Sequence, residues 1–322
     1  MVRIGKNSRV LVAAIIGIFA VLVCMSCEDK ILTAGRSTEA GSYDAVVCFI
    51  VNDARTGFVN VGTGTGYTAT ANGGTFTTSS GRNVYSTGGT DTGGTWVIPW
   101  FSPNTWPKYT GQGHVQLNQA TADLIASSEE WTVETIFALP SDHRADIVDQ
   151  YVWGFYGEED SNGFPTTILG LCWREVFMRI IPGYDDVAMP SGGWGGTRAI
   201  AGAAVGAWAH VVVTKTSGGT ITIYVNGDEF INNQTIDYPS SYTTGGFPRA
   251  WLGKTPYPIG GAMEGGEPPV ALPAEGTYGD DLVNTGYYQF AIDDKAWDAA
   301  EVKKRYGESP MGKGQMYVWN HQ

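Results

Sequence analysis

The chain has little cysteine and little positive charge. Only 4 of its 322 residues are cysteine, and no Cys/His cluster has the spacing of a zinc site. Lysine and arginine together number 20, against 32 aspartates and glutamates, and the formal net charge is −12. Nucleic-acid binding relies on basic patches, so we expect no nucleic-acid partner.

A single strongly apolar run opens the chain, and it is too short for a membrane span. Val10–Val23 is apolar, and a transmembrane helix needs about 20 such residues. It follows three basic residues, Arg3, Lys6 and Arg9. This pattern predicts a secretory signal peptide over residues 1–26. Met25-Ser26-Cys27 comes next and resembles the lipobox of bacterial lipoproteins, whose cysteine is acylated and becomes the N-terminus.

Cys27 is the expected lipidation site. Cys24 is the competing acceptor, but it follows the bulky Val23 where a small residue is wanted, and an ordinary signal peptide with incidental cysteines is the third alternative. The acidic Glu28-Asp29-Lys30 resembles tags that send lipoproteins to the outer face of the bacterial outer membrane. We therefore expect a lipid anchor as the only membrane contact, a polar tether over 27–42, and exposure to the cell exterior.

Removal of the signal takes away three basic residues and no acidic one, so the net charge moves from −12 to −15. A protein this acidic repels anionic polymers. Neutral polysaccharides are therefore the easier ligands, and acidic uronate polymers the harder ones.

The two remaining cysteines, Cys48 and Cys172, each lie in an apolar, strand-like run. Two buried free thiols are the favoured interpretation. A disulfide between them is the alternative in an oxidising compartment, and the sequence does not supply the geometry that would decide.

The segment Trp208–Phe230 predicts the central hairpin. The β-branched run His210–Lys215 and the alternating run Thr220–Val225 are separated by a glycine turn. Asn226-Gly227 closes the second run and predicts a type I′ turn, because both central residues of that turn need positive φ. A further strand is expected at Asp228–Ile231.

Other segments predict further strands and one helix. The expected strands are Tyr43–Val51, short threonine-rich strands within Gly62–Gly94, Gly113–Leu117, Trp131–Leu139, Ile147–Tyr156, Thr167–Trp173, Glu175–Ile181, Ala250–Gly253 and Tyr287–Ile292. Asp298 and Glu301 form a capping-box pattern that opens a short helix to Tyr306. The strand spacing fits one sandwich.

These segments together resemble a laminin-G-like, or concanavalin A-like, domain. The resemblance rests on the His-Val-Val-Val strand with its Tyr-Val-Asn-Gly hairpin, on His114–Leu117 with Trp131–Phe137, on the Leu-Gly strand Arg249–Lys254, and on Tyr287–Tyr306. It covers about Val46–Tyr306. It implies an all-β, two-sheet antiparallel jelly-roll sandwich over 43–306 with one short C-terminal helix, and it leaves the tail 307–322 unassigned. This fold hosts lectins, glycosidases, lyases and spacers, so the resemblance implies fold and not function.

No catalytic motif of the fold is found. Jelly-roll glycosidases usually carry Glu-x-Asp-x-x-Glu on one strand, and Glu158-Glu159-Asp160 instead predicts a solvated turn. Glu134 is expected to be alone and to point outward, and His210 to be structural. Arg174-Glu175 and Tyr287-Tyr288-Gln289 are only fragments of a lyase constellation. A divergent glycosidase or lyase would need two or more acids to converge, from among Glu134, Glu158, Glu159, Glu175, Asp280 and Asp281.

Aromatic residues are the most suggestive feature. The chain has 11 Trp, 16 Tyr and 12 Phe. Sugars present apolar C–H faces to such rings. The candidates flanked by Gly and Pro are Trp100, Trp106, Tyr109, Trp194 and Tyr257, which we expect on loops. Trp131, Trp208 and Trp251 fit strand patterns and are expected in the core.

A calcium ion would suit the oxygen ligands near strand ends. The candidates are Asp53, Asp280 and Asp281, with ordinary turn acids as the alternative. The sequence thus favours a non-catalytic, surface-anchored lipoprotein that binds a neutral polysaccharide through loop aromatics. The alternatives are an adhesive module that binds a protein or matrix partner, and a divergent glycoside hydrolase or polysaccharide lyase.

Overall fold

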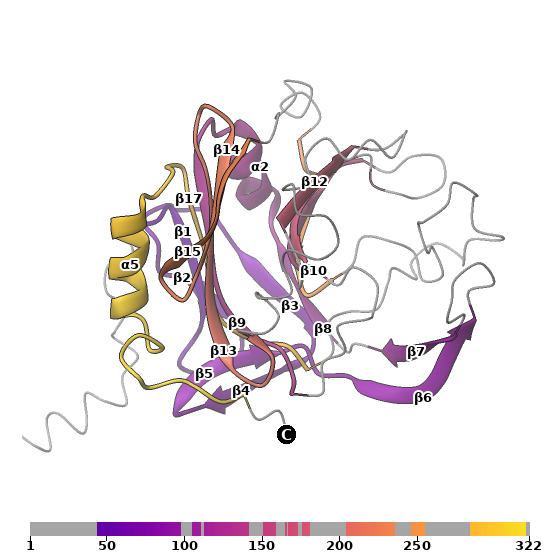
Figure 1. Ribbon diagram of the computed structural model, residues 1–322. Helices are drawn as coiled ribbons and strands as arrows, with labels where there is room; N and C mark the ends of the chain where they lie inside the picture. Colours follow the sequence, from indigo (N-terminus) through magenta and orange to yellow (C-terminus); the bar gives the residue numbers. More distant parts are fainter. Residues whose placement is uncertain are drawn as a thin grey trace, which may run out of the picture. The chain divides into compact units, whose positions relative to one another are not determined.

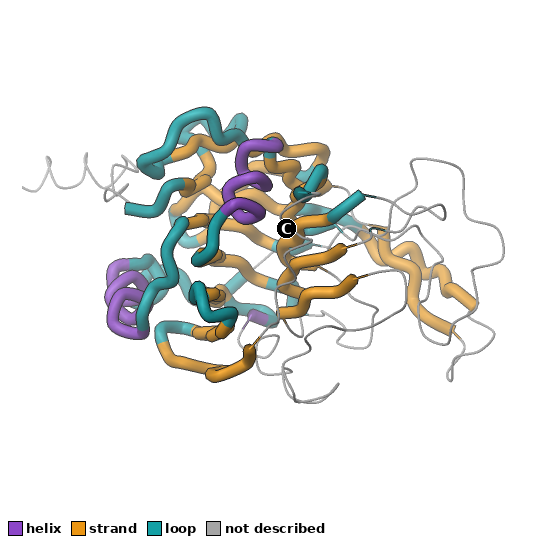
Figure 2. Tube along the Cα trace, turned by 90° about the horizontal axis from the view of Figure 1, so that it is seen from above, coloured by secondary structure: helices purple, strands orange, loops and turns teal. Residues whose placement is uncertain are grey.

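Two antiparallel sheets face each other in the computed structural model (Figures 1 and 2). The structure describes residues 44–97, 105–110, 113–141, 151–158, 165, 167–172, 176–180, 204–235, 246–254 and 284–319. The expected all-β sandwich is confirmed. The predicted signal peptide, Cys27 and the tether lie outside the described residues, so lipidation and location stay predictions.

Sheet A has the order β15-β14-β13-β9-β17-β1-β2, with the β4–β5 hairpin joined to β17 through β5. Its strands are β1 (Val47–Val51), β2 (Phe58–Asn60), β4 (Thr75–Ser79), β5 (Arg82–Ser86), β9 (Trp131–Ala138), β13 (Trp208–Lys215), β14 (Thr220–Val225), β15 (Asp228–Thr235) and β17 (Gly286–Asp293).

Sheet B has the order β12-β11-β10-β16-β8-β3. Its strands are β3 (Ala69–Gly73), β8 (Gly113–Leu117), β10 (Tyr151–Tyr156), β11 (Thr167–Cys172), β12 (Val176–Ile180) and β16 (Arg249–Leu252). A separate two-stranded ribbon pairs β6 (Thr90–Val97) with β7 (Thr105–Thr110).

The turn that joins β14 to β15 is of the predicted type. Asn226 has φ 53° and Gly227 has φ 84°, which are the two positive values that type I′ requires. The Asn226 N–H donates to the His210 carbonyl (2.8 Å), and the His210 N–H donates to Asn226 Oδ1 (3.0 Å). These bonds do not span the turn; they extend the pairing of β13 with β14 by one residue beyond Val211 and Val225 and fix the register of the two strands.

Strand β13 is buried on both faces of sheet A, which explains its nearly continuous apolar run. Every residue of β13 is buried. Ala209, Val211 and Val213 belong to the core cluster between the sheets, whereas Val212 belongs to a separate cluster on the outer face. That outer face is covered by helix α5 (Ala299–Glu308) and by the C-terminal segment 309–319 (Figure 1).

The C-terminal segment, which the sequence leaves unassigned, packs against sheet A. Met316 and Trp319 are buried, and the Trp319 ring lies 5.1 Å from the Trp208 ring, edge to face. Trp319 Nε1 also donates to the Asn284 carbonyl (2.7 Å). The segment therefore completes the outer apolar layer over the beginning of β13, at Trp208.

A second helix, α2 (Gln119–Ser127), was not predicted. The Asn118 side chain caps it by accepting from the Thr121 N–H, and Ala122 and Ile125 join the core between the sheets. Neither α2 nor α5 has the length and apolar character needed to cross a bilayer, and the same holds for every described helix.

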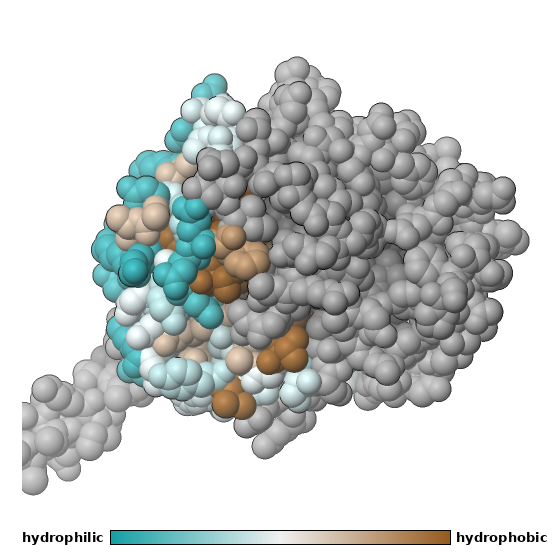
Figure 3. All heavy atoms as spheres, in the orientation of Figure 1, coloured by the Kyte–Doolittle hydropathy of each residue, from teal (hydrophilic) through white to brown (hydrophobic). Residues whose placement is uncertain are grey.

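The described surface around α5 is mainly hydrophilic, with apolar spots beside it (Figure 3). The large apolar side chains exposed among the described residues are Val59, Tyr317 and Val318. Isolated exposed apolar residues are ordinary on soluble domains.

Candidate functional site

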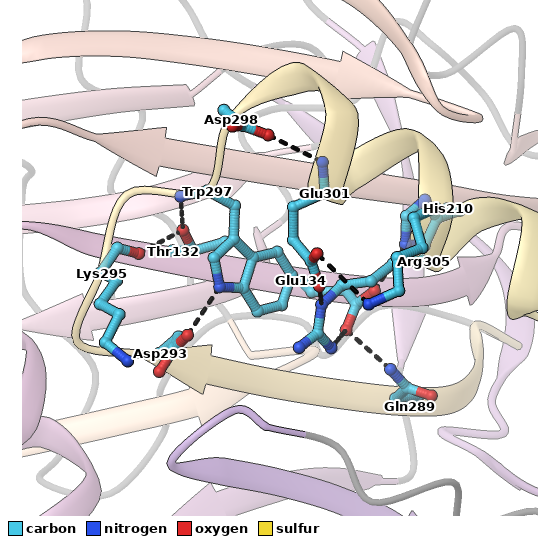
Figure 4. Close-up of polar contacts among 11 residues, drawn as sticks. Thr132, Glu134, His210, Gln289, Asp293, Lys295, Trp297, Asp298, Glu301 and Arg305 are labelled. Atoms are coloured by element: carbon cyan, nitrogen blue, oxygen red, sulfur yellow. Dashed lines mark hydrogen bonds and ion pairs between the residues drawn. The ribbon is translucent and has the colours of Figure 1, made fainter.

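The outer face of sheet A holds a buried polar cluster beneath α5, which we call the α5 clasp: Glu134, His210, Gln289, Glu301 and Arg305 (Figure 4). The His210 Nε2 and Glu134 Oε1 atoms lie 2.7 Å apart, and Gln289 Nε2 donates to Glu134 Oε2 at 2.8 Å. Arg305 Nη1 approaches Glu134 Oε2 at 3.7 Å, and Arg305 Nε donates to Glu301 Oε1 at 3.0 Å. Strands β9, β13 and β17 and helix α5 thus meet at one carboxylate.

This arrangement corrects the expectation for Glu134. The residue is on the outer face but is neither alone nor exposed: it is 1 % exposed, and its partner His210 is fully buried. A carboxylate so enclosed offers no surface to a glycosidic bond. The clasp holds α5 on the sheet, in agreement with the structural role expected for His210.

Local contacts fix the start of α5 above the clasp. The Asp298 side chain accepts from the Glu301 N–H (2.8 Å), as the capping pattern predicts. Trp297 Nε1 donates to Asp293 Oδ2 (2.6 Å), and the Arg305 guanidinium lies 3.7 Å from the Trp297 ring centroid. These contacts hold α5 on the sheet at two places, its first turn and Arg305, which lies about one turn before its end.

Cys48 lies in the apolar layer of this same outer face. It is a buried free thiol, as the sequence favours. Burial, and then the nearby Glu134 carboxylate, raise the pKa of the Cys48 thiol well above its ordinary value. The residue is therefore inert and not nucleophilic. Cys172 lies on β11 of the other sheet.

The outer face of sheet B holds the second feature, which we call the aromatic strip: Tyr151, Tyr156, Trp251 and His114. The ring centroids are 5.8 Å apart for Tyr151–Tyr156, 5.3 Å for Tyr156–Trp251 and 6.2 Å for His114–Trp251. The strip runs across strands β10, β16 and β8, which are adjacent in the sheet.

Alternation along the strands places these rings outside the core. Ala250 and Leu252 belong to the cluster between the sheets, so their neighbours Arg249 and Trp251 point to the other side. Trp251 is buried, as expected, but it packs on the outer face and not between the sheets.

Two glycines make room for the tyrosine rings. Gly154 and Gly170 are cross-strand partners on β10 and β11. A methyl group on Gly154 would lie 2.0 Å from Tyr156 Oη, and one on Gly170 would lie 2.8 Å from the Tyr151 ring. Tyr156 Oη in turn donates to the Lys254 carbonyl (3.0 Å). The glycines therefore leave the space that the two tyrosine rings occupy.

The accessible rim of the strip is polar and cationic. Trp251 is only 7 % exposed, whereas His114, Arg249 and Lys254 are half-buried and Gln116, the cross-strand partner of Trp251, is exposed. Lys254 Nζ lies 5.0 Å and Arg249 Cζ 5.5 Å from the Trp251 ring. Tyr151 and Tyr156 are fully buried, so the strip is a covered aromatic layer with polar groups along its rim.

The rim continues to the edge of sheet B. Thr70 of β3 is the cross-strand partner of Gln116, and Asn72 is the partner of His114; both are exposed. With strands about 4.8 Å apart, the row from Trp251 through Gln116 to Thr70 spans roughly 10 Å.

The predicted loop aromatics are placed only in part. Trp106 and Tyr109 lie on strand β7 rather than on a loop, opposite Trp96 and Asp91 of β6. Among the described strands β7 pairs with β6 alone, and an edge position tolerates the proline that β7 contains. The other three, Trp100, Trp194 and Tyr257, lie outside the described residues. Ligand binding by all five stays a prediction.

The acidic candidates are likewise placed only in part. Asp53 is exposed in the turn between β1 and β2, and Glu158 is exposed just after β10. Glu159, Glu175, Asp280 and Asp281 lie outside the described residues, as does Arg174. Within the described ranges, no three His, Cys, Asp or Glu side chains gather as a metal ion would need. The calcium site therefore stays a prediction.

Sequence reasoning missed both the clasp and the strip. A signal for the strip was present: Arg249-Ala250-Trp251-Leu252 alternates, which separates the tryptophan and arginine from the two small apolar residues. The clasp had no local signal, because Glu134, His210 and Arg305 are far apart in the chain.

No protein-family model and no curated protein matches the chain. Solved structures similar to it include a botulinum neurotoxin type G receptor-binding domain (11 % identity, TM-score 0.41, covering 81 % of this chain and 50 % of that one). Another is a Trypanosoma rangeli sialidase (12 % identity, TM-score 0.44, covering 83 % of this chain and 33 % of that one). A third is domain 4 of a family 43 extracellular arabinanase from Geobacillus stearothermophilus, in complex with arabinotriose (13 % identity, TM-score 0.42, covering 81 % of this chain and 97 % of that one). The chain thus spans half of the neurotoxin domain and a third of the sialidase chain. At these identities and scores the likeness carries no functional conclusion.

Proposed function

We propose that this protein is a non-catalytic, carbohydrate-binding lipoprotein on the outer face of a bacterial outer membrane. The observation that carries the proposal is the outer face of sheet B, where the exposed Gln116 and the half-buried His114, Arg249 and Lys254 lie around the nearly buried Trp251 ring. Aromatic faces and amide or cationic donors are the groups that sugars use. The lipobox-like Met25-Ser26-Cys27 supports the anchor.

The burial of the Glu134–His210 pair supports the non-catalytic part of the proposal. A glycosidase needs two carboxylates that reach one bond, about 5–5.5 Å or 6.5–9.5 Å apart. Glu134 is bound on all sides within the clasp. Incubation with each retained glycan, followed by a reducing-sugar assay, should therefore show no product; release of sugar ends above background would contradict this part.

A glycan array and affinity gels test the binding. The protein is used as Ser42–Gln322, which is a compact unit, with and without EDTA. We expect retention by at least one polysaccharide, weakened in Gln116→Ala and unchanged in Gln315→Ala, an exposed glutamine of the C-terminal segment. Trp106→Ala and Trp194→Ala test the aromatics named from the sequence, and loss on EDTA would reveal the metal. Retention by no glycan would overturn the proposal in favour of a protein-binding or structural role.

A further inference from the structure

We propose that Asn72 is a site of spontaneous deamidation, at which water converts an amide on the outer face of sheet B into a carboxylate. The chain contains three Asn-Gly pairs, at 72–73, 162–163 and 226–227. The second pair lies outside the described residues, and the structure gives the other two very different surroundings. The inference does not depend on glycan binding.

The reaction joins a side chain to the backbone of the next residue. The Gly73 nitrogen attacks Cγ of Asn72, a new C–N bond forms, and the side-chain amide leaves as ammonia with the proton of the Gly73 N–H. Water then opens the resulting cyclic imide to aspartate or isoaspartate, so water is the only co-reactant. Glycine has no Cβ to shield its nitrogen or to restrict its backbone, and Asn-Gly is therefore the pair in which this attack is easiest.

The Asn72 side chain is open to solvent. Asn72 and Gly73 end strand β3, and both are exposed. The neighbouring Ala71 packs against the core between the sheets, so Asn72 points to the outer face. Within the part of the chain that the structure describes, no hydrogen bond holds the side-chain amide of Asn72. Its Cγ is therefore free to approach the backbone.

The attacking nitrogen, that of Gly73, lies outside the hydrogen-bond ladder of sheet B. Opposed residues of an antiparallel pair alternate between bonded and non-bonded pairs. The Asn118 N–H donates to the Thr68 carbonyl (3.0 Å), and by alternation from there Gly73 and Gly113 form a non-bonded pair. The Gly73 N–H and carbonyl therefore point away from β8, and the carbonyl accepts from Tyr85 Oη instead (3.1 Å).

The fold resists the attack only weakly. The peptide that joins Asn72 to Gly73 must turn, which breaks the ladder pairing of Asn72 with His114. One such hydrogen bond contributes about 0.5–1.5 kcal/mol. Gly73 has φ +73° and Gly74 has φ +66°, so the chain already leaves the extended conformation at this point. The end of an edge strand opens at little cost, and the reactive geometry is therefore within reach.

Asn226-Gly227 is the same pair in closed surroundings. Gly227 is buried, and a methyl group on it would lie 2.8 Å from Tyr306 Cδ1. The Asn226 side chain is held through Oδ1, which accepts from the His210 N–H (3.0 Å). Attack on its Cγ would pull Oδ1 away from that N–H and move Gly227 against the Tyr306 ring. The structure thus protects Asn226 and leaves Asn72 open.

The reaction would change the outer face of sheet B. Either product places a negative charge at position 72, opposite His114. Isoaspartate also adds an atom to the backbone of β3, so the residues beyond it cannot keep their register with β8. The charge of this face would therefore change with the age of the protein.

The test follows both asparagines in one sample. The purified protein is incubated at mildly alkaline pH, where more of the backbone nitrogen is deprotonated, and a second sample is incubated in guanidinium chloride, where the fold is lost. Peptide mapping by mass spectrometry measures the change from amide to acid at each asparagine. Anion-exchange chromatography measures the added negative charge on the intact protein.

Asn72→Gln is the matched variant. It keeps an amide at the exposed position, but the longer side chain closes the ring far more slowly. Thermal unfolding verifies that the variant is folded.

In the folded protein we expect the peptide that holds Asn72 to be converted several-fold faster than the peptide that holds Asn226. In guanidinium chloride the two should react at similar rates, because the two pairs have the same chemistry. An acidic form separated by anion exchange should carry the change at Asn72, and Asn72→Gln should remove that form.

Three results would overturn the inference. Equal rates at Asn72 and Asn226 in the folded protein would mean that the sequence alone, and not the fold, sets the reaction. An unchanged Asn72 in the folded protein, over the time in which it reacts in guanidinium chloride, would mean that β3 protects it. A faster reaction at Asn226 would refute the protection assigned to its turn. None of these results bears on glycan binding.

Discussion

Replacing Glu134 by glutamine should show how much of the stability of this domain depends on one buried carboxylate. The change keeps the shape of the side chain and removes its charge. His210, Gln289 and Arg305 all contact the Glu134 carboxylate, and Arg305 is 8 % exposed. Without this charge the buried Arg305 keeps only the partly exposed Glu301, and the amide of the new side chain can no longer accept through both of its terminal atoms from His210 and Gln289. Breaking a buried pair in this way costs roughly 3–5 kcal/mol.

Glu301→Gln is the matched control, because Glu301 also binds Arg305. Its side chain is 32 % exposed, and an exposed pair is worth about 0–1 kcal/mol. Replacing a glutamate that contacts Arg305 by glutamine should therefore lower the free energy of unfolding several-fold more at Glu134 than at Glu301. The difference in burial is the physical reason.

Urea unfolding followed by tryptophan fluorescence measures both variants. With an m value of about 3 kcal/mol/M, the midpoint of Glu134→Gln should fall by roughly 1–1.7 M, and that of Glu301→Gln by no more than about 0.3 M. Equal midpoints would show that packing of Trp297 and Val302, and not the charge cluster, holds α5 on the sheet.

Three further predictions concern other parts of the chain. Gly154→Ala should displace the Tyr156 ring and lower the free energy of unfolding by about 1–3 kcal/mol, measured by thermal unfolding. Gly307→Ala is the control: a methyl group there meets nothing within 4 Å, so the change should be neutral or slightly stabilising. Equal effects of the two changes would refute the proposed crowding at Gly154. Cys48 should resist iodoacetamide in the native protein at about pH 8.5 and react after denaturation. Burial raises the folded-state pKa of the Cys48 thiol above the ordinary 9.0. The contribution of this thiol to folding stability is therefore present below about pH 9 and is lost as the pH rises through the folded-state pKa. Cys48→Ala should remove this dependence of stability on pH, and alkylation of the native protein would contradict the burial. Cys27→Ala should abolish labelling by radioactive palmitate and Cys24→Ala should not; the reverse would move the anchor.

Local rules predicted the parts of the fold that local contacts determine. The Asn226-Gly227 turn follows from the positive φ at both residues, and the start of α5 follows from the bond between Asp298 and the Glu301 N–H. Both contacts join residues within a few positions of one another. Helix α2 has the same kind of signal in Asn118, which the analysis of the sequence passed over.

Long-range contacts decided what local rules could not. Trp208 and Trp319 are over 100 residues apart and meet only because the C-terminal segment folds back on sheet A. Trp251 has the apolar character of a core residue, and its face is set by the register of β16 between β10 and β8. A shift of one residue would turn the ring into the core.

The sequence by itself determined the all-β class, the positions of most strands along the chain, the Asn226-Gly227 turn and the capped C-terminal helix, because alternation, turn residues and caps act over a few residues. Only the tertiary structure decided that Glu134 is enclosed with His210 and Arg305. It also decided that Trp251 lies on the outer face of sheet B beside Arg249 and Lys254. The physical reason is that burial and charge environment belong to surfaces assembled from distant strands.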